Sequence, residues 1–245
     1  MKNMDYSVAI IGAGASGLMC AIEAAKRNKT VIVLDHNRSI GSKIAISGGG
    51  RCNFTNLDCQ SQHYISENPH FVKSALSGFR PQNFISMLDK YNIGYEEKKS
   101  GQLFCKRSSQ DIIHMLMKEC EAYGVEILCD TKVISVKRDK LFEIKTNDGE
   151  IKSSSLVVAT GGISYPKLGA TDLGFKIARE FKIKVTKLRP ALVPLLFESK
   201  DRKVFSQLSG VSLKARVSLE KVAFTDDMLF THKGLSGPAI LQISS

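Results

Sequence analysis

The chain has 245 residues, a formal net charge of +11, 43% hydrophobic residues and 24% charged residues. This composition is ordinary for a globular protein and excludes collagen-like, disordered and coiled-coil chains. No apolar run approaches the roughly 18 residues that a membrane-spanning helix needs, and the N-terminus lacks the apolar segment of a signal peptide. We therefore expect a cytoplasmic protein without a membrane span, whose six cysteines, none in a Cys-x-x-Cys pair, are free thiols.

The first forty residues follow a β-α-β pattern around a glycine-rich turn. A buried strand over 7–11 leads into the turn GAGASG at 12–17, and a helix is predicted over 15–28. A second buried strand over 30–34 ends at Asp35. Because strand, glycines, helix, second strand and acid all coincide, the pattern predicts dinucleotide binding.

Each part of this pattern has a physical role. Gly12 permits the tight turn, Gly14 lets the backbone approach a pyrophosphate, and Gly17 lets helix and strand pack closely. The helix N-terminus presents free N–H groups and a positive dipole to phosphates. Asp35 can accept hydrogen bonds from ribose hydroxyls.

A second glycine-rich segment, over 38–56, is also basic and contains three consecutive glycines at 48–50. Because such a run costs backbone entropy, we interpret it as a close approach to a flat or bulky ligand. Lys43 and Arg51 could neutralise a phosphate, and the Asn53 amide can donate to and accept from a heterocycle. The alternative interpretation is a flexible loop.

The middle of the chain adds helices and a β-meander. Residues 68–130 are predicted to be rich in helix, and Asn-Asp-Gly at 147–149 predicts a hairpin turn. A buried strand over 155–159 then runs into another glycine-rich turn at 160–169. Two glycine-rich strand exits in one domain indicate a ligand lying across the carboxyl edge of the sheet.

The pattern changes after residue 181, where short strand candidates alternate with polar connections, and Pro238 would suit the first turn of a helix. The strand candidates cover 183–185, 192–197, 211–219 and 228–230. The sequence therefore predicts an α/β fold. A Rossmann-like dinucleotide-binding domain with inserted helices and a β-meander is followed by the beginning of an antiparallel β domain.

Positive charge is concentrated between Lys176 and Lys221, where twelve basic and four acidic residues give a net charge of +8. We interpret this segment as a solvated basic face, or as one that an acidic partner covers. Attraction for phosphate-bearing ligands or nucleic acid is the alternative. Because few aromatic residues are interleaved with these charges, we expect no nucleic-acid partner.

Five blocks of the sequence resemble the BaiN-like, or aminoacetone-oxidase-type, family of bacterial NAD(P)/FAD-dependent oxidoreductases. They lie in the expected order at 8–17, 41–56, 157–169, 189–195 and 230–242. The second block, GSKIAISGGGRCNFTN, is more specific than a dinucleotide fingerprint. The resemblance implies bound FAD that carries out hydride transfer, with NAD(P)H or a small organic substrate as the donor.

The resemblance also implies four groups of FAD-binding residues. They are Gly12, Gly14, Ala15, Ser16 and Gly17 with Asp35; Lys43, Gly50, Arg51 and Asn53; Val133; and Thr160, Gly161 and Gly162. By position, the first group would hold the pyrophosphate and the adenosine ribose, and the second would line the path to the flavin. The third would bind adenine through its backbone, and the fourth would close over the cofactor.

Two departures from the family pattern stand out. The family tends to have Thr-Gly-Asp-Gly where this chain has Thr-Asp-Leu-Gly at 171–174, which leaves the contacts of that glycine pair open. Family members also continue beyond the last block. We therefore expect residues 1–188 to be an FAD-binding domain without its C-terminal return segment, and 189–245 to be the incomplete start of an inserted β-barrel-like domain.

The sequence thus predicts an FAD-dependent oxidoreductase that acts on a small-molecule substrate. It identifies no catalytic residue, although Ser164 and Tyr165 are candidate proton donors beside the second glycine turn. Three alternatives stay open. They are a nicotinamide-only dehydrogenase, a truncated and non-catalytic flavoprotein fragment, and a flavin-dependent RNA-modifying enzyme.

Overall fold

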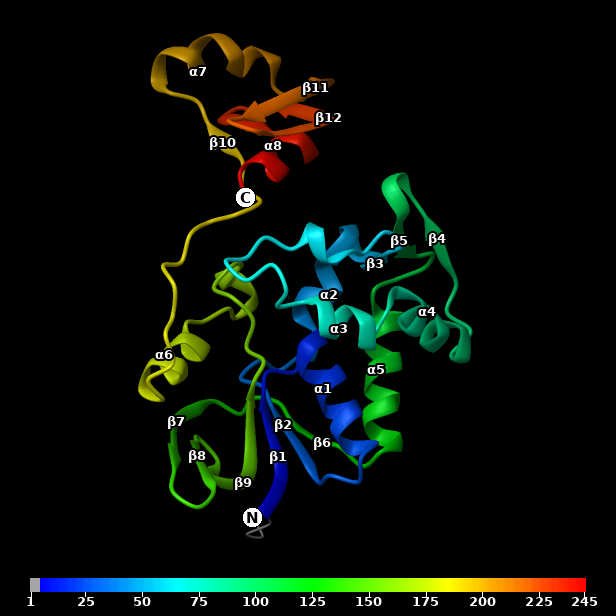
Figure 1. The fold of residues 1–245 in the computed structure, drawn as a ribbon, viewed down its shortest axis with the longest axis vertical. Helices are drawn as coiled ribbons and strands as arrows, with labels where there is room; N and C mark the ends of the chain where they lie inside the picture. The colour runs from blue at the N-terminus through cyan, green and yellow to red at the C-terminus, as the bar shows by residue number, and fades with distance from the viewer. Residues whose placement is uncertain (1–4) are drawn as a thin grey trace. The chain divides into compact units, whose positions relative to one another are not determined.

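A computed structural model describes residues 5–245. The chain divides into two compact units, with the boundary in the sequence between Lys184 and Val185. Among the described residues no helix is long and apolar enough to cross a membrane. Each unit is described by itself below (Figure 1).

The first unit is built on a six-stranded mixed sheet with the order β6-β2-β1-β9-β8-β7. Its strands are β1 (Asp5–Ile11), β2 (Val31–Leu34), β6 (Glu126–Leu128), β7 (Val133–Arg138), β8 (Phe142–Thr146) and β9 (Gly149–Val158). The pairs β1–β2, β2–β6 and β1–β9 are parallel, while β7, β8 and β9 form an antiparallel meander. Ile144 lies opposite Ile151, so the predicted hairpin is confirmed.

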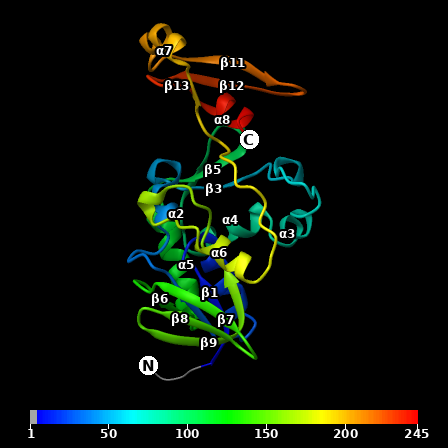
Figure 2. The same cartoon turned by 90° about the vertical axis from the view of Figure 1, so that its left-hand side faces the viewer.

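Apolar side chains fill both faces of this sheet. On one face, Ile10 and Val33 belong to the core that includes α1 (Ala15–Ala25) and α5 (Gln110–Ala122), which lie side by side in Figures 1 and 2. On the other face, Ile11 packs in a second core that includes Ile177 of α6 (Leu173–Glu180) and residues of the meander. Because its strands are covered on both sides, the parallel part of the sheet is made of continuous apolar runs.

The insertions between β2 and β6 form a smaller sheet of three antiparallel strands, in the order β3-β5-β4. Its strands are β3 (Asn53–Asn56), β4 (Tyr95–Glu97) and β5 (Gln102–Cys105). The helices of the same insertions are α2 (Ser42–Ile46), α3 (Lys73–Gly78) and α4 (Pro81–Lys90). Single 3₁₀ turns cover Ser47–Gly50, Ser61–His63, Lys99–Gly101 and Pro166–Leu168. The segment 38–56 is therefore an ordered helix, turn and strand, and the alternative of a flexible loop does not hold.

The second unit is a four-stranded antiparallel sheet in the order β10-β13-β12-β11. Its elements are β10 (Leu195–Leu196), α7 (Ser199–Phe205), a 3₁₀ turn (Ser206–Leu208), β11 (Ser212–Leu219), β12 (Val222–Phe230), β13 (Gly234–Ser236) and α8 (Pro238–Ile243). The predicted strand over 183–185 is absent from the structure, and the one over 192–197 shrinks to two residues. Leu192 has φ 55°, which is incompatible with an extended strand.

A buried carboxylate on α5 stabilises the packing of α4 against that helix. Glu119 is 2% exposed and accepts hydrogen bonds from the Lys90 ammonium and, at 2.7 Å, from the Tyr91 hydroxyl. Burial alone would raise the pKa of Glu119, but these two hydrogen bonds outweigh it and hold that pKa below its ordinary value. The ionised form is therefore favoured in the folded state.

Replacing Glu119 by glutamine is expected to lower the free energy of unfolding by about 1–2 kcal/mol at neutral pH, because two donors lose a charged acceptor. The pKa of Glu119 is lower in the folded chain than in the unfolded chain, where it is about 4.3. Ionisation of Glu119 therefore stabilises the fold at pH values above the unfolded pKa. This stabilisation is lost as the pH falls through the folded pKa. The difference in the free energy of unfolding between the Glu119→Gln variant and the parent should therefore shrink below about pH 4. Urea denaturation across pH measures it, and Glu121→Gln, an exposed change on the same helix, is the control. An equal loss for both variants would contradict this account.

Candidate functional site

The three glycines of the first turn occupy three different environments. A Cβ at Gly12, whose φ is 112°, would lie 2.4 Å from the Ala159 carbonyl oxygen. A Cβ at Gly17 would lie 1.8 Å from the Gly12 carbonyl oxygen. At Gly14 a Cβ would meet no atom within 4 Å. Gly12 and Gly17 are thus required by packing inside the protein, whereas Gly14 faces open space at the start of α1.

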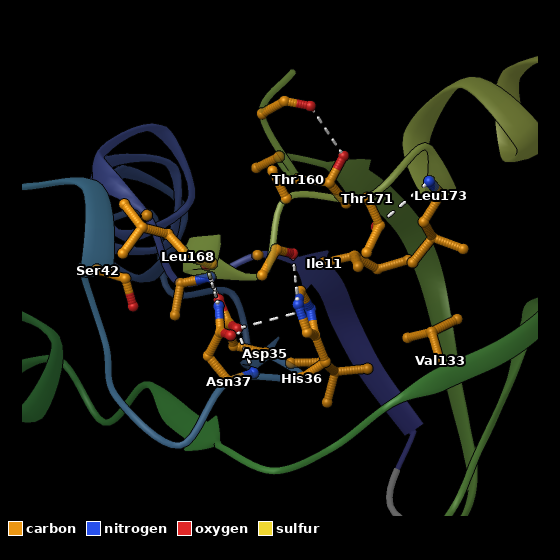
Figure 3. Close-up of a pocket in the computed structure, with 18 of the residues that line it drawn as sticks. Ile11, Asp35, His36, Asn37, Ser42, Val133, Thr160, Leu168, Thr171 and Leu173 are labelled. Carbon is orange, nitrogen blue, oxygen red and sulfur yellow. Dashed lines mark hydrogen bonds and ion pairs between the residues drawn. The ribbon is translucent and has the colours of Figure 1, made fainter. Parts of the chain in front are cut away.

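A cavity of about 830 Å³ lies at the carboxyl ends of β1, β2 and β9, where this turn begins. Figure 3 shows Ile11, Asp35, Val133 and Thr160 around it. Nine of the fourteen residues expected to bind FAD line the cavity: Gly12, Gly14, Ala15, Ser16, Asp35, Lys43, Val133, Thr160 and Gly161. A volume of this size is typical of sites for cofactors and drug-sized ligands.

Asp35 ties the glycine turn to the end of β2. One carboxylate oxygen accepts the Ala13 N–H at 2.7 Å, and the other accepts the Asn37 N–H at 2.8 Å. The side chain is 11% exposed. Each oxygen has a second lone pair, so the carboxylate can fix the turn and still accept a hydrogen bond from a ligand hydroxyl.

One wall of the cavity consists of residues 168–173, which sequence reasoning did not identify as a group. The Nε2–H of His36 donates to the Gly169 carbonyl oxygen at 2.7 Å (Figure 3), and a Cβ at Gly169 would lie 2.3 Å from the Asn37 side-chain oxygen. Gly174 approaches Thr160 so closely that a Cβ there would lie 2.5 Å from Oγ1. The retained glycine of the altered Thr-Asp-Leu-Gly sequence thus packs against the second turn.

The remaining expected residues lie outside the cavity lining. Gly17 is buried under the turn, and the Gly162 carbonyl oxygen accepts a hydrogen bond from Lys43 Nζ at 3.3 Å. The Arg51 guanidinium pairs with Glu96 of β4 at 2.9 Å, and Asn53 begins β3 opposite Phe104. Gly50 ends a run of three glycines with φ values of 57°, 66° and 84°. This turn requires glycine at each position, because other residues rarely adopt positive φ.

No thiol near the cavity has the character of a nucleophile. Burial raises the pKa of Cys52, and it raises the pKa of Cys105 to about 12, so both stay protonated at neutral pH. Tyr165 has φ 61° and is 62% exposed, and neither it nor Ser164 lines the cavity. The described residues therefore form a cavity whose size and lining fit a dinucleotide, and they single out no acid or base.

A family profile described as the HI0933-like protein Rossmann domain matches residues 6–235. The chain belongs to the HI0933-like family of FAD-dependent oxidoreductases. The resemblance found in the five sequence blocks is thereby confirmed. The α/β Rossmann-like fold class is confirmed as well.

Three curated relatives of this HI0933-like chain match nearly all of it. A ribosomal RNA dihydrouridine synthase of Haemophilus influenzae is 47% identical over 242 residues, which cover 96% of this chain and 60% of the relative. The protein of the same name in Escherichia coli strain K12 is 43% identical over 98% of this chain and 60% of its own length. A 3-dehydro-bile acid delta(4,6)-reductase of Clostridium scindens is 30% identical, over 97% of this chain and 59% of the relative. The chain thus spans about 60% of the length of these relatives.

Among solved structures, a 3-ketosteroid-delta4-(5alpha)-dehydrogenase from Rhodococcus jostii RHA1 aligns with a TM-score of 0.50 at 16% identity. The alignment covers 66% of this HI0933-like chain and 47% of that chain. At this identity the likeness concerns the fold alone.

The expectation of no nucleic-acid partner is contradicted by these relatives, two of which are named for an action on ribosomal RNA. That expectation treated the charged segment between Lys176 and Lys221 as lacking interleaved aromatic residues, whereas the segment contains Phe181, Phe197 and Phe205. In the structure these positions are distributed over α6, an irregular connection, α7 and β11. They do not form a single element whose composition could report on a partner.

Proposed function

We propose that this chain is the FAD-binding part of an enzyme that reduces uridine in ribosomal RNA to dihydrouridine. The observation that carries the proposal is the match of nearly the whole chain, at 47% and 43% identity, to two proteins of that name. The relative named for a bile-acid reduction is more distant, at 30% identity. The RNA-modifying alternative is therefore preferred to a small-molecule oxidoreductase.

The residues around the cavity fit the ADP half of FAD. The first N–H groups of a helix have no partner within it, so the start of α1 at Ala15 and Ser16 can donate to a pyrophosphate. Both residues are exposed, and the space in front of Gly14 is open. Asp35 would accept from the adenosine ribose, and the buried Val133 would present its backbone to adenine.

The flavin half would extend toward two sets of residues that the family resemblance implies. They are Lys43, Gly50, Arg51 and Asn53, and the turn Thr160, Gly161 and Gly162. Lys43 lines the cavity and is exposed, so its ammonium can approach a phosphate. Gly49 and Gly50 have open space where a Cβ would be, which permits a flat ring to approach their backbone. Gly50, Arg51, Asn53 and Gly162 would surround that ring.

The chemistry that bound FAD supplies is hydride transfer from NAD(P)H to the C5–C6 double bond of the uracil ring. In the balanced reaction, uridine, NAD(P)H and one proton give dihydrouridine and NAD(P)⁺. The protein contributes binding, orientation and exclusion of water around the cavity. We further propose the division into an FAD-binding domain over 1–188 and an inserted β domain that begins at 189.

Deletion of the gene from its host tests this function. Mass spectrometry of nucleosides from ribosomal RNA should show less dihydrouridine in the deletion strain, and the natural full-length gene should restore it. The purified gene product should carry FAD. Unchanged dihydrouridine in ribosomal RNA, together with reduction of a 3-dehydro bile acid with delta(4,6) double bonds by the purified protein, would instead favour the activity named for the Clostridium relative.

A further inference from the structure

The corner between β5 and α5 presents a basic surface. Residues 98–118 contain five lysines or arginines and one acid, Asp111. We define the β5–α5 surface by its exposed basic side chains, Lys98, Lys106, Arg107, His114 and Lys118. One face of α5 and of the residues just before it carries four of the charged or titratable side chains at spacings of three or four residues. They are Arg107, Asp111, His114 and Lys118.

This surface contains a shallow hollow of about 170 Å³. Its lining consists of Arg107, Asp111, His114, Met115 and Lys118 from α5 and its entry, and of Tyr91 and Ile93 from the segment after α4. The hollow therefore has three nitrogen-bearing side chains around it and lies between two ordered elements.

The acids near the hollow are already neutralised. Asp111 accepts from the Arg107 guanidinium, with Nε at 3.2 Å from its carboxylate, and Glu119 pairs with Lys90. The Arg107 side chain is still 84% exposed, and a guanidinium has five N–H donors, so it keeps donors for a ligand. The positive charge of Lys106 and Lys118 adds to this, which leaves the surface net positive.

The composition of the surface favours a phosphate backbone over a protein partner. Ile112, Ile113 and Leu116 of α5 are buried, so the exposed side chains here are mainly basic. Protein interfaces have an apolar and aromatic core. A nucleic-acid backbone is bound by lysine and arginine without one.

Three hydrogen bonds connect the chain on either side of Lys106 and Arg107 to residues 45–51, which contain the glycine turn at 48–50. The Cys105 N–H donates to the Arg51 carbonyl oxygen at 2.9 Å, and the Ser109 N–H donates to the Gly50 carbonyl oxygen at 2.8 Å. The Ser109 hydroxyl donates to the Ala45 carbonyl oxygen at 2.7 Å. Lys106 and Arg107 lie between these two anchored residues, so the basic surface directly adjoins the turn that we place beside the flavin.

We propose that the β5–α5 surface binds the phosphate backbone of the RNA substrate and leads it toward the glycine turn at 48–50. This inference rests on the proposed function, because it takes ribosomal RNA as the substrate. The hollow would receive a phosphate, and Lys106 would contact the neighbouring one. The surface would contact phosphates and not the edges of bases, so it would contribute affinity without base specificity.

The test compares the natural full-length protein with a triple variant, Lys106→Gln, Arg107→Gln and Lys118→Gln. Its matched control removes three exposed lysines from the meander, Lys137→Gln, Lys140→Gln and Lys145→Gln. Binding of unmodified ribosomal RNA made by transcription is measured over a range of salt concentrations. FAD content and thermal unfolding report on folding.

The triple variant should bind RNA at least about 10-fold more weakly at moderate salt, and its plot of log K against log salt should be shallower by about two to three units. FAD content and the control variant should match the parent. If the triple variant binds RNA as tightly as the control variant does, the proposal that the β5–α5 surface binds RNA is overturned. The proposed function would then be unaffected. A parent protein that neither binds RNA nor forms dihydrouridine would overturn both.

Discussion

Replacing Gly17 by alanine is expected to destroy the dinucleotide site and to destabilise the first unit by about 3 kcal/mol or more. The added Cβ would lie 1.8 Å from the Gly12 carbonyl oxygen, far inside van der Waals contact. The obstructing atom belongs to the backbone, so no side-chain rotation can relieve the overlap, and α1 has to move away from β1. Overpacking of ordinary core sites already costs about 1–3 kcal/mol.

Denaturant unfolding and retention of FAD through gel filtration measure this effect. Gly78→Ala is the control, because Gly78 ends helix α3 and a Cβ there would meet no atom within 4 Å. The control should unfold at the parent's denaturant concentration or slightly above it, since alanine is favoured over glycine in helices. A Gly17→Ala protein that keeps its stability and its FAD would show that the turn is not packed as described.

Replacing Gly14 by valine is expected to separate cofactor binding from stability. Gly14 has φ −86° and ψ −173°, a conformation open to any residue, and its Cβ position is unobstructed. The fold should therefore lose no more than about 1 kcal/mol, mostly from a poorer helix N-cap. The new side chain would occupy the space in front of the α1 N-terminus, where we place the pyrophosphate.

We expect the Kd for FAD to rise at least about 100-fold in Gly14→Val, which corresponds to roughly 2.7 kcal/mol. Titration of the apoprotein with FAD, followed by flavin fluorescence, measures the change. Unaltered FAD affinity in a folded Gly14→Val protein would mean that the pyrophosphate lies elsewhere. An unfolded variant would mean that the space before α1 is smaller than the structure shows.

The glycine turn and the cavity in front of it could be predicted from the sequence where their determinants are local. The turn at 12–17, the strands around it and Asp35 lie within thirty-five residues, and their spacing alone predicts how they assemble. The wall over 168–173 could not be predicted in the same way. It is fixed by contacts of His36 and Asn37 with residues more than 130 positions away.

The second unit was predicted in outline and missed in detail for a similar reason. Strand β11 has enough β-forming residues to be predicted over its whole length, whereas only the last three residues of β12 were predicted. Helix α7 contains Ser199-Lys-Asp-Arg-Lys, which shows no apolar periodicity, and its Phe205 instead joins a ring cluster with Phe197 and Phe230. Long-range packing of that kind overrides local pattern.

The expectation of no nucleic-acid partner is contradicted by the relatives named for ribosomal RNA, and it was based on a single segment of the sequence. The segment between Lys176 and Lys221 carries a formal net charge of +8. The β5–α5 surface has a comparable charge density over a shorter span, but only the fold shows that its lysines and arginines share one face beside the glycine turn.

Anaerobic oxidation of the reduced protein tests the central claim most directly. The natural full-length protein, with its FAD chemically reduced, is mixed with ribosomal RNA from the deletion strain in the absence of oxygen. Our account predicts that the yellow absorbance of oxidised flavin returns and that one dihydrouridine forms for each flavin oxidised. A protein that contains no flavin would contradict the account. So would a reduced flavin that ribosomal RNA leaves unchanged while a 3-dehydro bile acid with delta(4,6) double bonds oxidises it.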